Sequence, residues 1–205
     1  MYSLFIFCFV PNFVCDKIFY KMSGGDFKIK RYRKSNGKYV AMDASALSLE
    51  DDFGFIRYKA MSGLNSIGKN KSVYVETYAE SEDARIYMSD EVRREQTSCT
   101  LSVYVFGSDP SLPTSLPLST RIANAGNTWA EFYSKIEGCL ILWQDNYRQR
   151  KALLYVLEAP DVKTDMIKGV PYLQCDIKLT NVFGRTFSAG DKTIEKWLGE
   201  EVGNE

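Results

Sequence analysis

Alternating hydrophobic and polar positions recur along most of this chain and predict a protein built mainly from β-strands. The clearest case is the segment 97–107 (TSCTLSVYVFG), where Leu101, Val103 and Val105 would line one face of a strand. The same period of two marks residues 71–80, 85–88 and 171–184. The last of these ends in Asn181-Val-Phe-Gly184, a sequence typical of a turn.

Residues 27–40 (FKIKRYRKSNGKYV) alternate in the same way on both sides of Asn36-Gly37. Asn-Gly between two alternating runs is the strongest short signal for a β-hairpin. The segment carries six basic residues, which could form a phosphate-binding patch. Lysines also protect exposed sheet edges, so solvated strand faces near an edge are the favoured interpretation.

A helical period is clearest at residues 127–138 (NTWAEFYSKIEG). Thr128 and Glu131 have the spacing of a capping box, and Gly138 supplies a stop. The apolar stripe comprises Trp129, Phe132, Tyr133 and Ile136. Such a stripe could cradle a ligand, but at this spacing it more often packs against the core.

The remaining segments predict connections and one further helix. Residues 41–70 predict short strands and a loop, and residues 161–169 a polar segment with a short helical turn. Pro110, Pro113 and Pro117 exclude a helix interior from residues 108–120, which therefore predict an extended exposed loop. Near the C-terminus, Ile194, Trp197 and Leu198 predict a short helix followed by an acidic tail.

These elements favour a mainly β (α+β) protein, an antiparallel β-sandwich or barrel with one central helix and a short C-terminal helix. Residues 22–190 would form a single β-rich domain, and residues 191–205 the short helix and acidic tail. Residues 1–21 begin with an apolar stretch that is too short to span a bilayer and lacks the charge pattern of a signal peptide. We interpret them as an extension or an upstream misassigned start. Secretion is the alternative if they are a real signal.

The segment 139–157 (CLILWQDNYRQRKALLYVL) places Asp145, Arg148 and Arg150 between two apolar strands. They could form a catalytic cluster or the polar end of a hairpin. Asp and Asn favour turns, and Asp145 and Arg148 could pair across this one. An exposed pair of this kind contributes roughly 0–1 kcal/mol. A catalytic site would need a second carboxylate or a nucleophile nearby, and the sequence supplies none, so we favour the structural interpretation.

Composition narrows the function further. Basic and acidic residues number 26 each, whereas duplex-binding domains usually have a basic excess. The chain contains no histidine, the commonest general base and zinc ligand. Cys99, Cys139 and Cys175 are far apart and lie in strand-like runs, which indicates buried free thiols. The expectation is a protein that is not an enzyme and has no catalytic, cofactor-binding or metal-binding residues.

Residues 63–187 resemble small tail-region structural proteins of siphovirus-like phages and prophages of Bacteroidetes. The similar pieces are GLNSIGKNKSVYVETYAESEDARIYM, WAEFYSKIEGCLILWQDNYRQRKALLYVL and KGVPYLQCDIKLTNVFGRTF. The resemblance implies a tail-tube, distal-tail or tail-completion component that assembles with itself as a ring and with other virion tail proteins. It implies no catalytic residue, cofactor, membrane, specific nucleic acid or small-molecule substrate. The location would be the virion, assembled in the bacterial cytoplasm.

A ring subunit needs edge strands and loops that contact a neighbour. The candidate assembly contacts are the basic hairpin and the proline loop, represented by Lys30, Arg31, Arg33, Pro110, Pro113 and Pro117. Reversing the charge at the three basic residues is expected to block assembly without unfolding the monomer.

Two other functions remain open at this point. The first is a secreted carbohydrate- or peptide-binding β-sandwich, in which Trp129, Trp143 and Trp197 stack on the ligand. The second is a hydrolase with paired carboxylates drawn from Asp51, Asp52 and Asp145. Asp51 and Asp52 are adjacent and would point to opposite faces of a strand, which makes them a weak pair.

Overall fold

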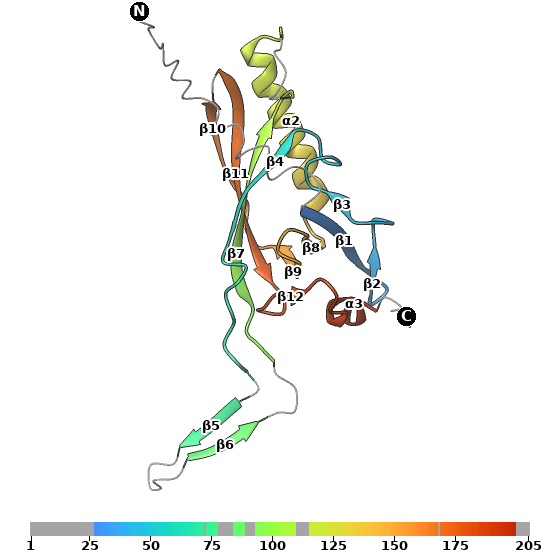
Figure 1. Ribbon diagram of the computed structural model, residues 1–205, viewed down its shortest axis with the longest axis vertical. Helices are drawn as coiled ribbons and strands as arrows, with labels where there is room; N and C mark the ends of the chain where they lie inside the picture. Colours follow the sequence, from blue (N-terminus) through green and yellow to red (C-terminus); the bar gives the residue numbers. More distant parts are fainter. Residues whose placement is uncertain are drawn as a thin grey trace, which may run out of the picture.

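The computed structural model describes residues 27–71, 73–77, 84–88, 93–109, 115–167 and 169–199. These parts form a ten-stranded antiparallel sheet with the main order β2-β1-β8-β9-β11-β7-β4, and a separate two-stranded sheet, β5-β6 (Figure 1). The strands are β1 (Phe27–Ser35), β2 (Lys38–Ala41), β3 (Leu47–Ser48), β4 (Ile56–Ser62), β5 (Val73–Thr77), β6 (Ala84–Met88), β7 (Thr97–Phe106), β8 (Leu140–Asp145), β9 (Arg150–Val156), β10 (Asp161–Ile167), β11 (Val170–Asn181) and β12 (Phe187–Ser188). The helices are α2 (Leu118–Ile136) and α3 (Thr193–Leu198).

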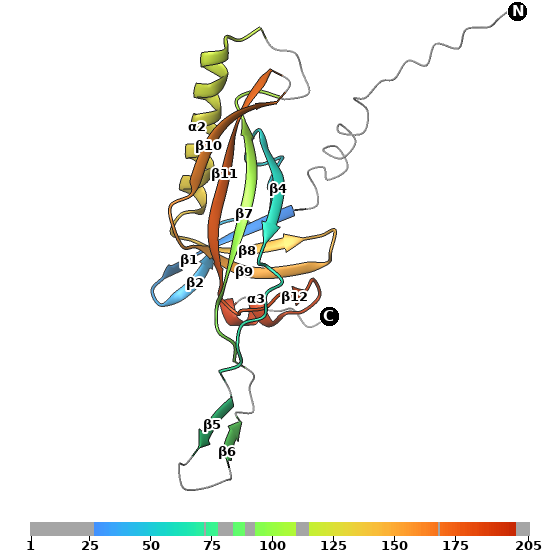
Figure 2. The same cartoon turned by 90° about the vertical axis from the view of Figure 1, so that its left-hand side faces the viewer.

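The large sheet folds back on itself. In Figure 2, β4, β7, β10 and β11 run along the length of the molecule, whereas β1, β8 and β9 cross them. The two halves are joined by a short pairing of Leu179–Asn181 with residues 154–156. The two halves also meet through side chains, since the ring of Phe27 on β1 stacks on that of Tyr58 on β4 at a centroid distance of 3.8 Å. The predicted β-rich, sandwich-like fold with a central and a C-terminal helix is therefore confirmed.

Helix α2 lies against the long strands β7 and β11 and closes one side of the core (Figure 1). Phe132 and Ile136 are buried, and Trp129 and Tyr133 pack on the same core, as predicted for the apolar stripe. The predicted start was wrong, because the helix begins at Leu118 directly after Pro117. Proline is tolerated at a helix N-terminus, where backbone N–H groups have no helical partner.

The first hairpin forms as predicted. Asn36 and Gly37 have φ values of 49° and 80°, the left-handed backbone that a tight two-residue hairpin turn requires. Tyr32 points to a second apolar cluster, on the opposite face of β8 and β9 from the main core. Ile194 and Leu198 of α3 belong to that cluster, so the C-terminal helix packs against the large sheet.

Residues 161–167 form strand β10 and not the predicted helical turn. The strand pairs with β11 from Asp161↔Asp176 to Ile167↔Val170. All seven of its residues are exposed. A strand exposed on both faces has no hydrophobic alternation, which removes the signal on which a strand prediction depends.

Residues 63–96 leave the end of β4 and return to the start of β7, and we call them the arm. We call the large sheet with its two helices the body. Near the body the two sides of the arm are paired: the N–H of Lys71 donates to the carbonyl of Arg93 (2.7 Å), and the N–H of Glu95 donates to the carbonyl of Lys69 (2.8 Å). Farther out, β5 pairs with β6 from Val73↔Met88 to Thr77↔Ala84. Both views show β5 and β6 projecting far from the large sheet (Figures 1 and 2).

Candidate functional site: an arginine-lined cavity at the base of the arm

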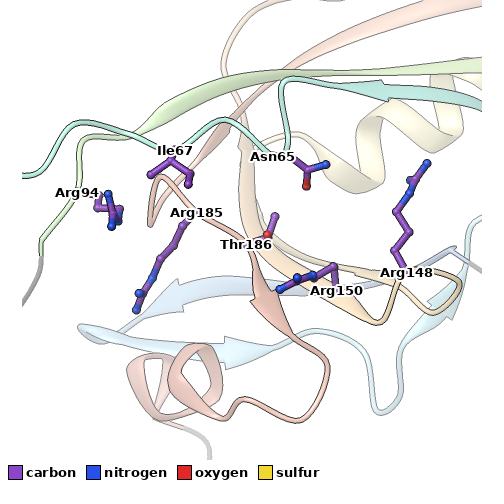
Figure 3. Close-up of a pocket in the computed structure, with 7 residues that line it drawn as sticks. All are labelled: Asn65, Ile67, Arg94, Arg148, Arg150, Arg185 and Thr186. Atoms are coloured by element: carbon purple, nitrogen blue, oxygen red, sulfur yellow. The ribbon is translucent and has the colours of Figure 1, made fainter.

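A cavity of about 460 Å³ lies where the arm meets the body. Figure 3 shows its lining residues, which come from both sides of the arm, from the β8–β9 turn and from the turn before β12. They are Asn65, Ile67, Arg94, Arg148, Arg150, Arg185 and Thr186. Four of the seven carry a guanidinium group and none carries a carboxylate, so the cavity is strongly basic.

The Asn181–Gly184 turn fastens the arm to the body beside this cavity. Asn181 is fully buried, and its side chain accepts from the N–H of Phe183 (3.2 Å) and donates to the carbonyl of Arg185 (3.0 Å). The carbonyl of Gly184 then accepts from the N–H of Gly68 (2.9 Å). Gly184 has a φ of +59°, and a Cβ there would lie 1.8 Å from the carbonyl oxygen of Glu95. Only glycine allows this approach.

Asp145 and Arg148 pair in the β8–β9 turn, as the sequence predicted, and Arg148 lines the cavity. The Oδ1 atom of Asp145 accepts from the backbone N–H of Arg148 (2.9 Å), and its Oδ2 from the guanidinium Nη1 (3.0 Å). The side-chain bond with Asp145, and one with Tyr58, raise the pKa of the Arg148 guanidinium above its ordinary value. The expectation that the pair is exposed holds for Arg148 only, because Asp145 is only 2% exposed.

The other three arginines form no ion pair with any described residue. Arg94 donates from Nη1 to the carbonyl of Gly68 (3.2 Å). The guanidinium of Arg185 lies 4.6 Å from the centre of the Phe187 ring. Arg150 is exposed at the start of β9. Since a guanidinium is always charged and offers planar pairs of donors, this arrangement favours carboxylates or phosphates as ligands.

The residues predicted as assembly contacts lie elsewhere. Arg33 is exposed on β1, and the ammonium of Lys30 lies 5.3 Å from the Tyr32 ring centre. Pro117 is exposed at the start of α2. Pro110 and Pro113 lie outside the described residues, as do residues 1–21.

Arg31 differs from the expectation of a free contact residue, because it forms an internal ion pair with Asp43. Its Nε donates to Asp43 Oδ2 (2.9 Å), its Nη2 to Oδ1 (2.6 Å) and its Nη1 to the carbonyl of Lys135 (3.1 Å). Burial alone would raise the pKa of Asp43, but the hydrogen bonds from the Arg31 side chain and backbone hold it below its ordinary value. Charge reversal at Arg31 would therefore disrupt the subunit itself, contrary to what the sequence suggested.

The carboxylates considered for hydrolysis do not meet. Asp51 and Asp52 follow β3 in a turn, not a strand, and both accept hydrogen bonds from Ser48: its hydroxyl donates to Asp51 (2.9 Å) and its N–H to Asp52 (2.6 Å). The two side chains hold the backbone of their own turn. Asp145 is bonded to Arg148 in the turn between β8 and β9.

The three tryptophans do not share a surface. Trp143 is 1% exposed and packs in the main core, and Trp129 is half-buried beside Phe132. Trp197 is 44% exposed, stacks on the ring of Tyr39 and meets the ring of Phe183 edge-on. Only Trp197 presents much of its ring to solvent, so the predicted three-residue stacking platform is not assembled.

Cys99, Cys139 and Cys175 are buried free thiols, as predicted. Burial raises the pKa of Cys99 to about 11 and that of Cys175 to about 12, where a neighbouring Asp176 adds to the shift. In the described parts of the chain, no three potential metal-ligating side chains come together. Nor is any described helix long and apolar enough to cross a membrane.

Arg148 and Arg150 could be recognised in the sequence as a candidate cluster, whereas Arg94, Arg185 and the cavity itself could not. The lining residues come from segments up to about 120 positions apart, as from Asn65 to Thr186, and no local pattern links them. No protein-family model matches this chain, and no curated protein matches it.

Proposed function

We propose that this protein is a structural subunit of a phage or prophage virion, a tail-region component that acts by assembling with copies of itself. The observation that carries the proposal is the arm. Its outer strands β5 and β6 pair only with each other among the described strands. An isolated two-stranded hairpin is marginally stable in water, so a hairpin held away from its own body is best explained by a neighbour that supports it.

The exposed edge formed by β10 supports the same function. Val162, Met166 and Ile167 on this strand are exposed apolar side chains, between 39% and 49% accessible. β10 pairs with β11 on one side only, so its other edge is open in the described sheet. Proteins usually protect such edges, and an exposed apolar edge strand is a surface for pairing with another chain.

Near-zero net charge and the resemblance of residues 63–187 to tail-region structural proteins agree with this function. The exposed Trp197 alone does not favour the alternative of a carbohydrate-binding module. That alternative depended on several aromatic rings on one face.

The test compares the full chain with a variant in which residues 72–92 are replaced by Asn-Gly. Lys71 and Arg93 already face each other across a hydrogen bond of 2.7 Å, so a two-residue turn can close the shortened arm. The mass of both proteins is measured by light scattering over a range of concentrations, and the particles are imaged by negative stain. Circular dichroism and thermal unfolding establish that the body is intact.

We expect the full chain to form rings, tubes or concentration-dependent oligomers, and the shortened variant to remain monomeric with an unchanged body. A full chain that stays monomeric at every concentration would overturn the proposal. So would a shortened variant that assembles as well as the full chain, because the arm would then have no part in assembly.

A further inference from the structure

The outer part of the arm and the rest of the chain carry opposite net charges. Residues 72–92, which we call the arm tip, contain six carboxylates and one basic residue, Arg85, so their net charge is −5. The acidic residues are Glu76, Glu80, Glu82, Asp83, Asp90 and Glu91. Because the whole chain is neutral, the remaining residues have a net charge of +5. The net charge of zero is therefore the sum of an acidic arm tip and a basic remainder of the chain.

We propose that the arginine cavity of one copy binds the acidic arm tip of a second copy. This deepens the proposed function, on which it rests, by naming the two surfaces that meet. Arg94, Arg150 and Arg185 line a cavity of about 460 Å³ and form no ion pair with described residues. A segment with six carboxylates supplies the ligands that guanidinium groups bind best.

Strands β5 and β6 of the arm tip lie away from the cavity of their own chain. The cavity lies at the base of the arm, between Ile67 and Arg94. From Lys71 the chain continues outward as an extended hairpin, and six extended residues span roughly 20 Å. Figures 1 and 2 show β5 and β6 pointing away from the body in both views. A hairpin directed away from its own cavity is available to a second molecule.

The geometry also fixes the class of assembly. The donor surface (the arm tip) and the acceptor surface (the cavity) are different parts of one chain, so the contact is head-to-tail. Such a contact leaves one free arm tip and one free cavity after each addition, and it generates closed rings or open filaments. A symmetric dimer could close only if two arm tips and two cavities met at once.

The binding step can be measured apart from assembly. The receptor is the full chain with residues 72–92 replaced by Asn-Gly, which keeps the cavity but removes the competing arm tip. The probe is a fluorescent synthetic peptide of residues 72–92, and binding is followed by anisotropy at low and high sodium chloride. A matched control peptide has all six carboxylates replaced by Gln or Asn.

We expect the acidic peptide to bind, the neutral peptide to bind at least about tenfold more weakly, and added salt to weaken binding. The receptor variant Arg150→Glu/Arg185→Glu should lose the acidic peptide by a similar factor. It should gain a peptide in which the six acidic residues are replaced by Lys. Lys59→Glu, which changes an exposed lysine on β4 outside the cavity, should leave binding unchanged.

Equal binding of the acidic and neutral peptides would overturn the inference, as would equal loss with Lys59→Glu. A short DNA duplex that binds through Arg150 and Arg185 while the peptide does not would also overturn it, because the cavity would then serve a nucleic acid. If the full chain assembles but the peptide fails to bind, the inference is wrong and the proposed function stands. If the full chain never assembles, both fall.

Discussion

The Asp43–Arg31 ion pair is expected to be one of the strongest single contributions to the stability of this subunit. Replacing Asp43 by Ala would leave three donors of Arg31 without a carboxylate: the backbone N–H (2.9 Å), Nε (2.9 Å) and Nη2 (2.6 Å). The side chains of the pair are only 14% and 6% exposed, so water replaces these bonds poorly. Removing one partner of a buried pair costs about 3 kcal/mol.

For a chain of this length, 3 kcal/mol corresponds to a decrease in melting temperature of roughly 6–12 °C. The assay is thermal and urea unfolding of Asp43→Ala at a matched protein concentration. The control is Arg33→Ala, which truncates an exposed residue of the same strand and should change the free energy of unfolding by at most about 0.5 kcal/mol. The double variant Arg31→Ala/Asp43→Ala should lose less than the sum of the two single losses.

The same pair predicts a pH dependence of stability. The pKa of Asp43 is lower in the folded chain than its ordinary value of 3.8. Its contribution is therefore fully present above that ordinary value and is lost as the pH falls through the lower folded value. The gap in stability between the native chain and Asp43→Ala should be constant near neutral pH and shrink below about pH 4. A loss equal to that of Arg33→Ala, or a gap that ignores acid, would refute the reasoning.

Two further predictions concern the fastening of the arm and of α3. Gly184→Ala should lower the free energy of unfolding by at least about 2 kcal/mol, because its φ is +59° and a Cβ would lie 1.8 Å from the Glu95 carbonyl oxygen. The control Gly190→Ala, with nothing within 4 Å of an added Cβ, should be nearly neutral in the same urea titration. Glu195→Ala should cost about 3 kcal/mol, because it leaves the ammonium of Lys151, 2% exposed, without its carboxylate at 2.6 Å. Glu158→Ala breaks the exposed pair with Lys178 and should cost much less than Glu195→Ala, and equal losses for the two would contradict the role of burial.

Most of the sheet could be predicted because its strands are buried on alternate residues. In β7 and β11 every second side chain enters the core, so the sequence shows a clear period of two. β10 has no buried face, and the pattern is absent from its sequence. The first turns of α2 were missed for a related reason: their apolar residues Leu118 and Ile122 are exposed, and the proline that precedes them indicated a loop.

The candidate site could be predicted only in part. Asp145 and Arg148 are three residues apart, so turn chemistry alone was enough to pair them. Arg94 and Arg185 reach the cavity because the Asn181–Gly184 turn docks on the arm, a contact between distant segments. A signal for the proposed contact segment was nevertheless present, since a running sum of charge along the sequence would have separated residues 72–92 from the rest.

The two proposed contact surfaces differ in their physics, and salt can separate them. Docking of the acidic arm tip into the arginine cavity is electrostatic, so sodium chloride should weaken it by screening. Pairing along β10 buries Val162, Met166 and Ile167, and sulfate should strengthen it by favouring the burial of apolar surface. If the arm–cavity contact joins subunits within a ring and β10 joins that ring to other surfaces, each salt would act on a different contact. Sodium chloride would weaken the contact within the ring, and sulfate would strengthen the contact along β10. The assembly would then need both contacts to grow beyond a single ring.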